Sequence, residues 1–305
     1  MKVISAAEVH AALDWELLSA ALERAFVEGA EVPVRHAHAL GPQDTLLLMP
    51  AWNARLVVTK LVTVIPSADH TVQATLVACD RATGAPLALI DGEAVTLRRT
   101  AAASALAARR MARPDAARLL VVGGGRLAGW MARAHAALRP GLRSIGVWAR
   151  RGAQAEALAS ELAAQGLPAA AVDDLECGVR QADIVCCATT AREPVVRGDW
   201  LAPGAHLDLV GGFRRDMREV DDSAVARARI VVDTFAGVLS EAGDLVQPLE
   251  RGVIGRDSIV GDLRELLSGR VACRHDDGQL TLFKSVGTAL EDLAAAELAL
   301  QRVTG

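Results

Sequence analysis

The first third of the chain shows two kinds of hydrophobic pattern. An opening segment has apolar residues at helical spacing through about Val27, and segments rich in β-branched or apolar residues follow at 56–65, 71–79 and 86–90. A long helical segment at 94–111 comes next. Successive strands joined by turn-like connections are typical of an antiparallel meander, so we expect an α+β domain here.

After residue 118 the pattern changes to short apolar strands that alternate with helices. The expected strands lie at 119–122, 144–148, 184–188, 205–210 and 230–233. This alternation requires a crossover between strands and typically gives a parallel sheet with helices on both faces. The predicted fold class is therefore α/β, with a Rossmann-type doubly wound parallel sheet plus the α+β domain.

The end of the chain returns to a hydrophobic segment at 280–286 and a helix at about 288–301. We place this tail back on the first domain. The predicted domains are accordingly residues 1–112 with 281–305, and residues 113–280.

Composition and charge exclude several classes of function. The 305 residues carry a formal net charge of -4, and 3% of them are aromatic. Because basic residues neither dominate nor form a long run, we expect no nucleic-acid partner. The apolar stretches have the length of strands, so we expect no membrane span.

The spacing of the cysteines and histidines argues against a disulfide framework and against a metal site. The 5 cysteines are an odd number without a Cys-x-x-Cys pair, which favours reduced thiols and a cytoplasmic location. His36, His38 and His70 show no metal-ligand spacing, so no metal is expected. Asp208 and Asp233 are interpreted as residues that hold nearby loops through hydrogen bonds.

A glycine-rich sequence joins the first strand of the second domain to its helix. Gly123, Gly125 and Ala128 match the spacing G-x-G-x-x-A, in which the glycines permit a tight turn and a close approach to a pyrophosphate. The helix start, at Arg126 and Leu127, offers amide groups to the phosphates. These residues are predicted to bind a nicotinamide dinucleotide, and an ordinary turn is the alternative.

The end of the next strand selects between the two nicotinamide cofactors. An acidic residue there would bind the ribose hydroxyls of NAD, but this chain has Ala149, Arg150 and Arg151. Two guanidinium groups suit a 2′-phosphate, so NADP(H) is the preferred cofactor and NAD(H) the alternative. Both arginines would otherwise be ordinary surface charges.

Three cations of the first domain suit a substrate that carries a carboxylate. Lys60 lies inside a predicted strand, where a buried ammonium needs a partner. Arg99 lies near the start of the long helical segment, and Arg35 lies in a polar loop. Acidic residues do not neighbour them in sequence, although each could instead be ion-paired or solvated.

Several short motifs follow one another in a fixed order along the chain. They are Leu48-Met-Pro-Ala51, Thr59-Lys-Leu-Val62, Arg98-Arg-Thr-Ala-Ala102, Gly123–Ala128, Ala182-Asp-Ile-Val185, Trp200-Leu-Ala-Pro-Gly204, Val210-Gly-Gly212, Arg218-Glu-Val-Asp221, Glu241-Ala-Gly-Asp244 and Leu282-Phe-Lys-Ser-Val-Gly287. With these motifs the chain resembles the ornithine cyclodeaminase/mu-crystallin family over nearly its whole length.

The resemblance implies a homodimer formed through the sheet of the first domain, and a substrate site in the cleft between the domains. It assigns Arg35, Lys60 and Arg99 to the substrate carboxylate. Lys60 and Arg99 are the expected catalytic residues, with Lys60 as a proton donor beside the reacting nitrogen.

The resemblance also identifies residues around the cofactor. Ser285 and Val286 match the segment close to the nicotinamide, and Thr189 and Val210 are expected on the dinucleotide side of the cleft. Glu241 and Asp244 are expected to support these residues rather than to touch the substrate.

Two positions depart from the pattern of true ornithine cyclodeaminases. Phe213 stands where that pattern has an aspartate, and Leu47 stands where it has a glutamate before the Met49-Pro50 pair. Leu47, Met49 and Phe213 are expected to line the substrate pocket. The distal ammonium of ornithine would lose both carboxylate partners, which would cost several kcal/mol.

These departures favour a reductase of cyclic ketimine acids, of the pyrroline- or piperideine-2-carboxylate type, that uses NAD(P)H and yields a cyclic amino acid. The alternatives are an ornithine cyclodeaminase, an amino-acid dehydrogenase such as alanine dehydrogenase, and a non-enzymatic NADP-binding protein of the crystallin type.

Overall fold

The computed structural model describes residues 1–69 and 71–304, so His70 lies outside the described residues. The elements form two compact units, residues 1–103 with 287–305 and residues 104–286. This division differs from the expected domain boundaries at 112 and 281. The hydrophobic segment near the chain end is strand β14 (Leu280–Lys284), and it pairs with strands of the second unit on both sides. The long helix α3 (Gly92–Met111) contributes residues to both units.

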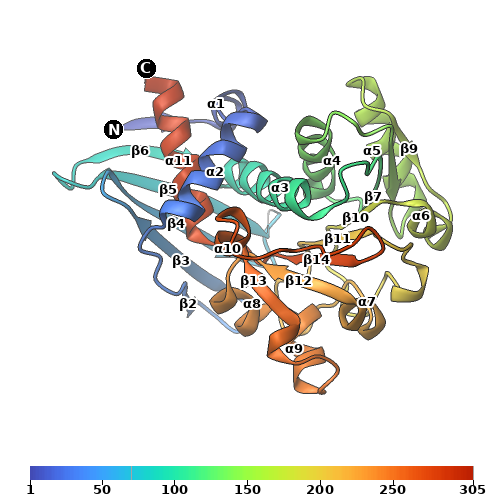
Figure 1. Cartoon of the computed structure of the whole chain (residues 1–305). Helices are drawn as coiled ribbons and strands as arrows, with labels where there is room; N and C mark the ends of the chain where they lie inside the picture. The colour runs from blue at the N-terminus through green and yellow to red at the C-terminus, as the bar shows by residue number, and fades with distance from the viewer. Residues whose placement is uncertain (70, 305) are drawn as a thin grey trace. The chain divides into compact units, whose positions relative to one another are not determined.

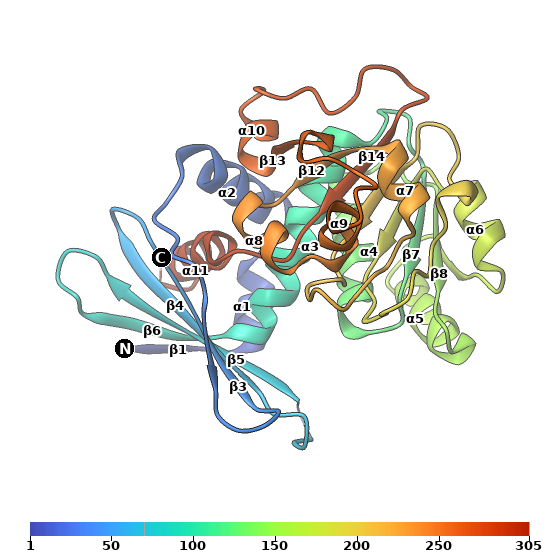
Figure 2. The ribbon, with the colours of Figure 1, turned by 90° about the horizontal axis from the view of Figure 1, so that it is seen from below.

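A six-stranded sheet forms the first unit, in the order β1-β6-β5-β4-β3-β2. The strands from β2 to β6 pair antiparallel as a meander, and β1 joins β6 in parallel (Figure 2). The bounds are Lys2–Ile4 for β1, His36–Ala39 for β2, Thr45–Trp52 for β3, Leu56–Val64 for β4, Val72–Asp80 for β5 and Pro86–Asp91 for β6. The predicted meander at 56–65, 71–79 and 86–90 corresponds to β4, β5 and β6.

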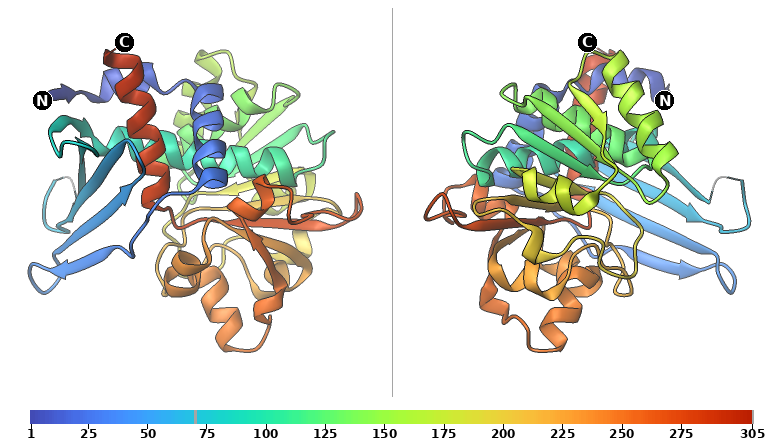
Figure 3. Two further views of the ribbon diagram at one scale, coloured as in Figure 1. Left: turned by 60° about the vertical axis from the view of Figure 1, so that its left-hand side comes forward. Right: turned by 90° about the vertical axis from the view of Figure 1, so that its right-hand side faces the viewer.

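Helices pack on one face of this sheet. The helices are α1 (Ala6–Ala12), α2 (Trp15–Glu28) and α11 (Ala289–Thr304), and α11 contacts both β3 and β4 (Figure 3, left). Successive strand residues point to opposite faces, so Val58, Lys60 and Val62 face the helices while Leu61 faces the other way and is 37% exposed. The strand period therefore places the Lys60 ammonium in the layer between sheet and helix.

Eight parallel strands form the sheet of the second unit, in the order β13-β12-β14-β11-β10-β7-β8-β9 (Figure 1). Besides β14, the strands are β7 (Arg118–Val122), β8 (Ser144–Trp148), β9 (Ala169–Ala171), β10 (Ile184–Cys187), β11 (His206–Leu209), β12 (Ala228–Val232) and β13 (Ile259–Asp262). The order of the strands reverses between β7 and β10, which confirms the predicted doubly wound sheet and puts its topological switch point there.

Helices and short connections link these strands. The helices are α4 (Arg126–Leu138), α5 (Gly152–Ala164), α6 (Leu175–Gln181), α7 (Asp222–Arg227), α8 (Phe235–Glu241), α9 (Gly243–Glu250) and α10 (Leu263–Leu267), with 3-10 turns at Gly198–Trp200 and Arg256–Ser258. Strands buried on both faces read as continuous apolar runs, and β10 is buried at every position. Within residues 1–69 and 71–304, no helix combines the length and the apolar character that a bilayer crossing requires.

Asp183 ties together the amino ends of two central strands. One carboxylate oxygen accepts hydrogen bonds from the backbone N–H groups of Ala117 and Arg118, both at 3.0 Å. The other accepts from the guanidinium groups of Arg113 at 3.1 Å and Arg118 at 2.9 Å. Burial alone would raise the pKa of Asp183, but the hydrogen bonds from Arg118 and the two amides outweigh it and lower the pKa. The fold therefore favours the ionised carboxylate at this edge.

Replacing Asp183 with asparagine keeps the size of the side chain but removes its charge. We expect the free energy of unfolding of D183N at pH 7 to fall by about 2 kcal/mol, because charge-assisted hydrogen bonds are lost. The folded-state pKa of Asp183 lies below its ordinary value of 3.8, so this stability is present above that pH and disappears as the pH falls through the folded pKa. Urea denaturation at pH 7, 4 and 3 measures the difference from wild type, and a constant difference would contradict the assignment.

Candidate functional site

The loop between β7 and α4 requires glycine where the fingerprint predicts it. Gly123 adopts a φ of +143°, which side chains rarely adopt, and a Cβ there would lie 2.6 Å from the carbonyl oxygen of Ala188. A Cβ on Gly124 would lie 2.9 Å from the Cβ atoms of both Ala149 and Gln154. The loop is therefore packed tightly against the ends of β8 and β10.

The other side of this loop is open. Gly125 is the residue before α4, and a Cβ built on it would meet no atom within 4 Å. Among the described residues no side chain caps α4, so the helix begins at Arg126 and Leu127 with its amide end available to an anion. Ala128 is fully buried behind the loop, as close packing of helix and strand requires. An open cradle above an uncapped helix start fits a dinucleotide pyrophosphate.

The residues that choose between NAD and NADP lie at the end of β8. Ala149 is buried beneath Gly124, whereas Arg150 and Arg151 are exposed and directly precede α5. Neither guanidinium forms an ion pair with a carboxylate in the described part of the chain. This end of the strand therefore presents positive charge.

The carboxyl ends of β10, β11 and β14 bring further predicted residues to the same edge of the sheet. Thr189 follows β10, Val210 follows β11, and Ser285 and Val286 follow β14. Because all three strands are parallel to β7 and lie on one side of it, these residues line the edge beyond the switch point. The sequence predictions for the cofactor thus fall on one continuous edge of the second unit.

Buried carboxylates hold the backbone of this edge. Asp233 accepts hydrogen bonds from the Ser285 hydroxyl at 3.1 Å and from the Val286 N–H at 2.8 Å, so it holds a loop as expected. Glu219 accepts from the Thr189 N–H at 2.7 Å. Burial raises the pKa of Glu219 to about 7, against the opposing charge of Lys284. The sequence analysis did not identify Glu219 or Lys284 as site residues.

In the first unit, Lys60 and Arg99 lie against two consecutive acidic residues of α11. The Lys60 Nζ atom is 2.8 Å from a carboxylate oxygen of Asp292 and 3.4 Å from the Thr96 hydroxyl. Arg99 contacts Glu291 at 2.7 Å and Asp292 at 3.2 Å. All four charged side chains are buried. The alternative interpretation, ion pairing, therefore holds for both cations.

The acidic partners of Lys60 and Arg99 are not their neighbours in sequence, because they lie about two hundred residues further along the chain. The signal in the sequence was the pair Glu291-Asp292 in the first turn of a helix rich in alanine and leucine. Burial lowers the pKa of Lys60 to about 8, and the charge of Asp292 opposes this effect while that of Arg99 adds to it. Lys60 is thus a cation at neutral pH that can release a proton slightly above it.

The remaining predicted residues of the first unit lie around this cluster. Arg35 donates a hydrogen bond to the Gly287 carbonyl at 2.7 Å. Gly287 has a φ of +81°, and a Cβ there would lie 2.4 Å from the Arg99 guanidinium. Met49 pairs with Lys60 across β3 and β4, and Leu47 lies two residues away on the same face. The first unit thus brings together five of the predicted substrate-site residues: Arg35, Leu47, Met49, Lys60 and Arg99.

Phe213 belongs to the second unit, where it follows the glycine pair after β11 and is 44% exposed. Asp208 does not hold a loop. Its carboxylate lies 3.0 Å from the His135 Nε2 atom of α4, and Cys186 lies close enough that the three could surround a metal ion. His135 and Asp208 already contact each other directly, so these two side chains have partners without a metal ion. The spacing of residues along the chain did not predict this contact.

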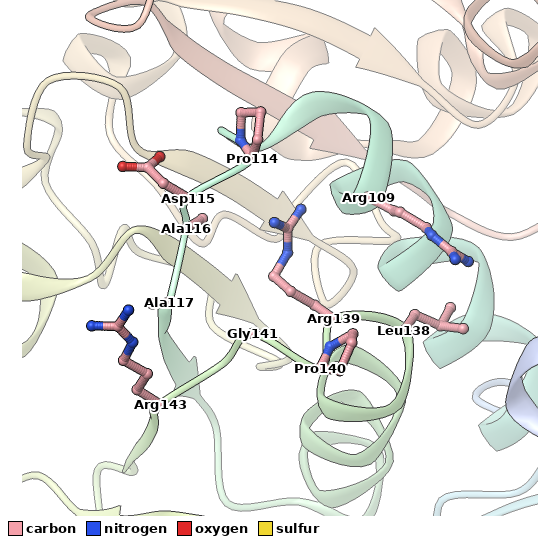
Figure 4. A pocket seen from close by; sticks show the side chains of 10 residues that line it. All are labelled: Arg109, Pro114, Asp115, Ala116, Ala117, Leu138, Arg139, Pro140, Gly141 and Arg143. Carbon is pink, nitrogen blue, oxygen red and sulfur yellow. The ribbon is translucent and has the colours of Figure 1, made fainter.

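A hollow of about 430 Å³ lies near the amino edge of the second unit, away from the fingerprint. Figure 4 shows the side chain of Arg139 reaching toward the segment that precedes β7. Its guanidinium donates hydrogen bonds to the carbonyls of Ala108 at 3.0 Å and Arg113 at 3.1 Å. Burial lowers the pKa of Arg139, as does the nearby charge of Arg109. These hydrogen bonds satisfy backbone carbonyls near the end of α3, so we interpret Arg139 in this hollow as a structural residue.

Comparison with known proteins agrees with these features. The model of the ornithine cyclodeaminase/mu-crystallin family matches residues 1–305. The chain is 34% identical to a Delta(1)-pyrroline-2-carboxylate reductase of Colwellia psychrerythraea, over 99% of both chains. It is 34% identical to the mouse ketimine reductase mu-crystallin, over 88% of this chain and 82% of the relative.

A solved structure extends the likeness to three dimensions. It is that of the Thermococcus litoralis Delta(1)-pyrroline-2-carboxylate reductase in complex with NADH and L-proline. The identity is 32%, the TM-score is 0.94, and the match covers 100% of this chain and 98% of the other. The resemblance in the motifs is therefore confirmed, and this chain belongs to the ornithine cyclodeaminase/mu-crystallin family.

Proposed function

We propose that this protein is an NAD(P)H-dependent reductase of cyclic ketimine acids such as Δ1-pyrroline-2-carboxylate or Δ1-piperideine-2-carboxylate. The observation that carries the proposal is the Lys60 ammonium, buried beside Met49 and paired with Asp292. A cation in this setting can give a proton to an imine nitrogen and then recover one from solvent. Names of relatives that share more than 80% of their length with this chain agree with that reaction.

The reaction divides between the cofactor and the side chains. When bound, reduced nicotinamide supplies a hydride to the C=N carbon. The first unit binds the substrate carboxylate, orients the ring and holds the proton at Lys60 Nζ. Glu291 and Asp292 lie against Lys60 and Arg99, and Arg35, which donates to the Gly287 carbonyl, is the third cation proposed to bind the substrate carboxylate.

Leu47 and Phe213 disfavour the alternative substrate, ornithine. Both are apolar where the cyclodeaminase pattern has a carboxylate, and a distal ammonium needs such a partner when it leaves water. A ring without a distal charge has no such need. Reduction of a cyclic imine is therefore favoured over cyclisation of ornithine with release of ammonia.

NADP(H) is the proposed cofactor, with NAD(H) as the alternative. The support is the exposed pair Arg150 and Arg151 at the end of β8, where NAD enzymes have an acidic residue. The Thermococcus litoralis relative was solved with NADH. The preference for one cofactor therefore depends on these two arginines.

A homodimer that forms through the first unit's sheet is also proposed. The sheet face opposite α11 carries Leu48 and Leu61, which pair with each other across β3 and β4. Leu61 is 37% exposed, and a second apolar face would cover it. The cytoplasmic location stays a prediction.

Turnover of a cyclic imine is the direct test of the proposal. Purified protein should oxidise NADPH when either cyclic imino acid is added, and the absorbance at the NADPH band should fall. The variant Lys60→Met should lose at least about 100-fold in kcat/KM, because the proton donor and part of the carboxylate site are lost. Lys2→Met is the matched control, since Lys2 contacts the backbone of Val303 at the other end of the chain.

Three other outcomes of this assay would each contradict the proposal. Ammonia released from ornithine without net NADPH oxidation would identify a cyclodeaminase. Reduction of NAD(P)⁺ by alanine, with no turnover of imines, would identify a dehydrogenase. Tight NADPH binding without turnover of any of these compounds would identify a binding protein.

The pH dependence of the rate tests the role of Lys60. The pKa of this group is about 8, so kcat/KM for the imino acid should fall about tenfold per pH unit above that value as the proton donor is lost. Asp292 raises the Lys60 pKa, so Asp292→Asn should move this alkaline limb to lower pH. Glu297→Gln, on the same helix, should leave it in place. An alkaline limb unchanged in D292N would refute the assignment.

Alanine substitutions at both Arg150 and Arg151 test the choice of cofactor. Loss of charge-assisted contacts to a 2′-phosphate should raise the Kd of NADPH by about 10- to 100-fold and leave that of NADH nearly unchanged. Fluorescence titration measures both constants. Arg180→Ala is the control, since Arg180 pairs with Glu176 on α6. Equal weakening of both cofactors would show that the arginines do not read the phosphate.

A further inference from the structure

Three buried charged residues lie beneath the carboxyl edge of the second unit's sheet. Lys284 is the last residue of β14, Asp244 is in α9, and Glu219 lies in the segment before α7. The Lys284 Nζ atom is 3.0 Å from an Asp244 oxygen and 4.0 Å from a Glu219 oxygen, and all three side chains are fully buried. A buried charge of this kind needs an opposite charge beside it, and Lys284 and Asp244 provide this for each other.

Glu219 uses both of its carboxylate oxygens to hold backbone. Its Oε1 atom accepts from the Thr189 N–H at 2.7 Å, in the loop after β10. Its Oε2 atom accepts from the N–H groups of Gly211 at 2.8 Å and Gly212 at 3.3 Å, in the loop after β11. One carboxylate thus fixes two loops that follow neighbouring strands.

The glycines of the second loop allow this close approach. A Cβ on Gly211 would lie 1.9 Å from the Thr189 carbonyl oxygen and 2.4 Å from Glu219. A Cβ on Gly212 would lie 2.3 Å from an Asp244 oxygen and 3.2 Å from the Lys284 Nζ atom. The loop therefore rests directly on Glu219, Asp244 and Lys284.

Glu219 is itself held from below. Asp244 accepts hydrogen bonds from the backbone N–H groups of Glu219 at 2.7 Å and Val220 at 3.2 Å, and Lys284 holds Asp244 in turn. The chain of contacts from β14 through α9 to Glu219 fixes both the backbone and the carboxylate of Glu219. Such support is what a residue needs if it is to place other atoms accurately.

The two loops lie where the nicotinamide half of a dinucleotide belongs. The fingerprint follows β7 and the two arginines follow β8, so the phosphates and the adenosine half belong to that side of the switch point. The loops after β10 and β11 lie on the opposite side. We propose that Glu219, fixed by Asp244 and Lys284, is a positioning residue that sets the loops at Ala188–Thr189 and Val210–Phe213 against the nicotinamide ring. This inference rests on the proposed function only for its kinetic readout.

An isosteric substitution separates this role from simple filling of space. In Glu219→Gln, one of the two carboxylate oxygens becomes an NH₂ group, and whichever way the amide turns, it must face a backbone N–H of one loop. One loop is therefore released while the other is kept. Glu219→Asp keeps the charge but shortens the reach, so it provides a second variant if the first folds poorly.

The test compares wild type, E219Q, E219D and the control D183N as full chains with NADPH bound. Asp183 is a good control because it is also a buried carboxylate that holds backbone amides, but at the amino edge of the same sheet. Amide hydrogen exchange should speed up at residues 188–191 and 210–213 in E219Q, and near residues 117–118 in D183N.

The kinetics of cyclic imine reduction then test whether the nicotinamide ring is still placed correctly. We expect kcat of E219Q to fall about 10- to 100-fold, because small misplacements of reacting atoms have effects of this size. The deuterium isotope effect from 4-deuterated NADPH should rise, since hydride transfer becomes slower than the other steps. The Kd of NADPH should change less than about threefold, because the phosphates bind elsewhere. D183N should keep the wild-type kcat and isotope effect.

Two results would overturn the inference. One is unchanged exchange at both loops in E219Q and E219D. The other is an isotope effect and kcat equal to those of wild type in a variant whose exchange has changed. If the wild-type protein turns over no imine, the proposed function fails. The inference about Glu219 is then tested by the fluorescence spectrum of bound NADPH in the two variants. A spectrum altered in E219Q but not in D183N supports it, and an unaltered one overturns it.

Discussion

The ion pairs that Lys60 of β4 and Arg99 of α3 form with helix α11 are the constraint on which the first unit depends. Lys60 and Arg99 are buried, and their carboxylate partners come from the last helix of the chain. Removal of one partner from a buried pair typically costs about 3–5 kcal/mol, because a charge remains without compensation. The helix therefore cannot slide or rotate freely on the sheet. The charge of Asp292 also raises the pKa of Lys60, so the Lys60–Asp292 pair contributes both to the stability of the unit and to its proposed chemistry.

The second unit uses buried carboxylates in a different way. Asp183 at one edge of the sheet and Glu219 at the other both accept hydrogen bonds from backbone amides. At the amino edge, these hydrogen bonds connect the start of β7 to the residue before β10. At the carboxyl edge Gly211 and Gly212 lie against the acceptor, because a Cβ at either position would meet Thr189, Glu219 or Asp244. The same interaction, a buried carboxylate that accepts from backbone N–H groups, therefore stabilises strands at one edge and positions loops at the other.

Much of this organisation followed from local patterns. The alternation of strands and helices predicted the doubly wound sheet, and the spacing of Gly123, Gly125 and Ala128 predicted the cradle before α4. Strand β9 escaped prediction because its three residues are all alanine, which has low strand propensity. Strand β14 was recognised as hydrophobic, but an apolar pattern does not say which sheet a strand will join.

The parts that could not be predicted are those that depend on distant pairs. Nothing local to Lys60 indicates Asp292, since 232 residues separate them. Glu219 lies in the motif Arg218-Glu-Val-Asp221, but its role became visible only when the N–H groups of Thr189 and Gly211 were both found to donate to it. Such residues are identified by the hydrogen bonds and ion pairs that they form with residues distant in the sequence.

The discontinuity of the first unit has a consequence for how the protein is made. Residues 1–103 are synthesised before the second unit, whereas α11 is synthesised after it. Until α11 emerges, Lys60 on the sheet and Arg99 on α3 lack the carboxylates of Glu291 and Asp292, and the sheet face that α11 covers stays exposed. The second unit can complete its sheet during that interval, since β14 precedes α11 along the chain. In the order of translation, the first unit can therefore be completed only after the whole second unit has been made.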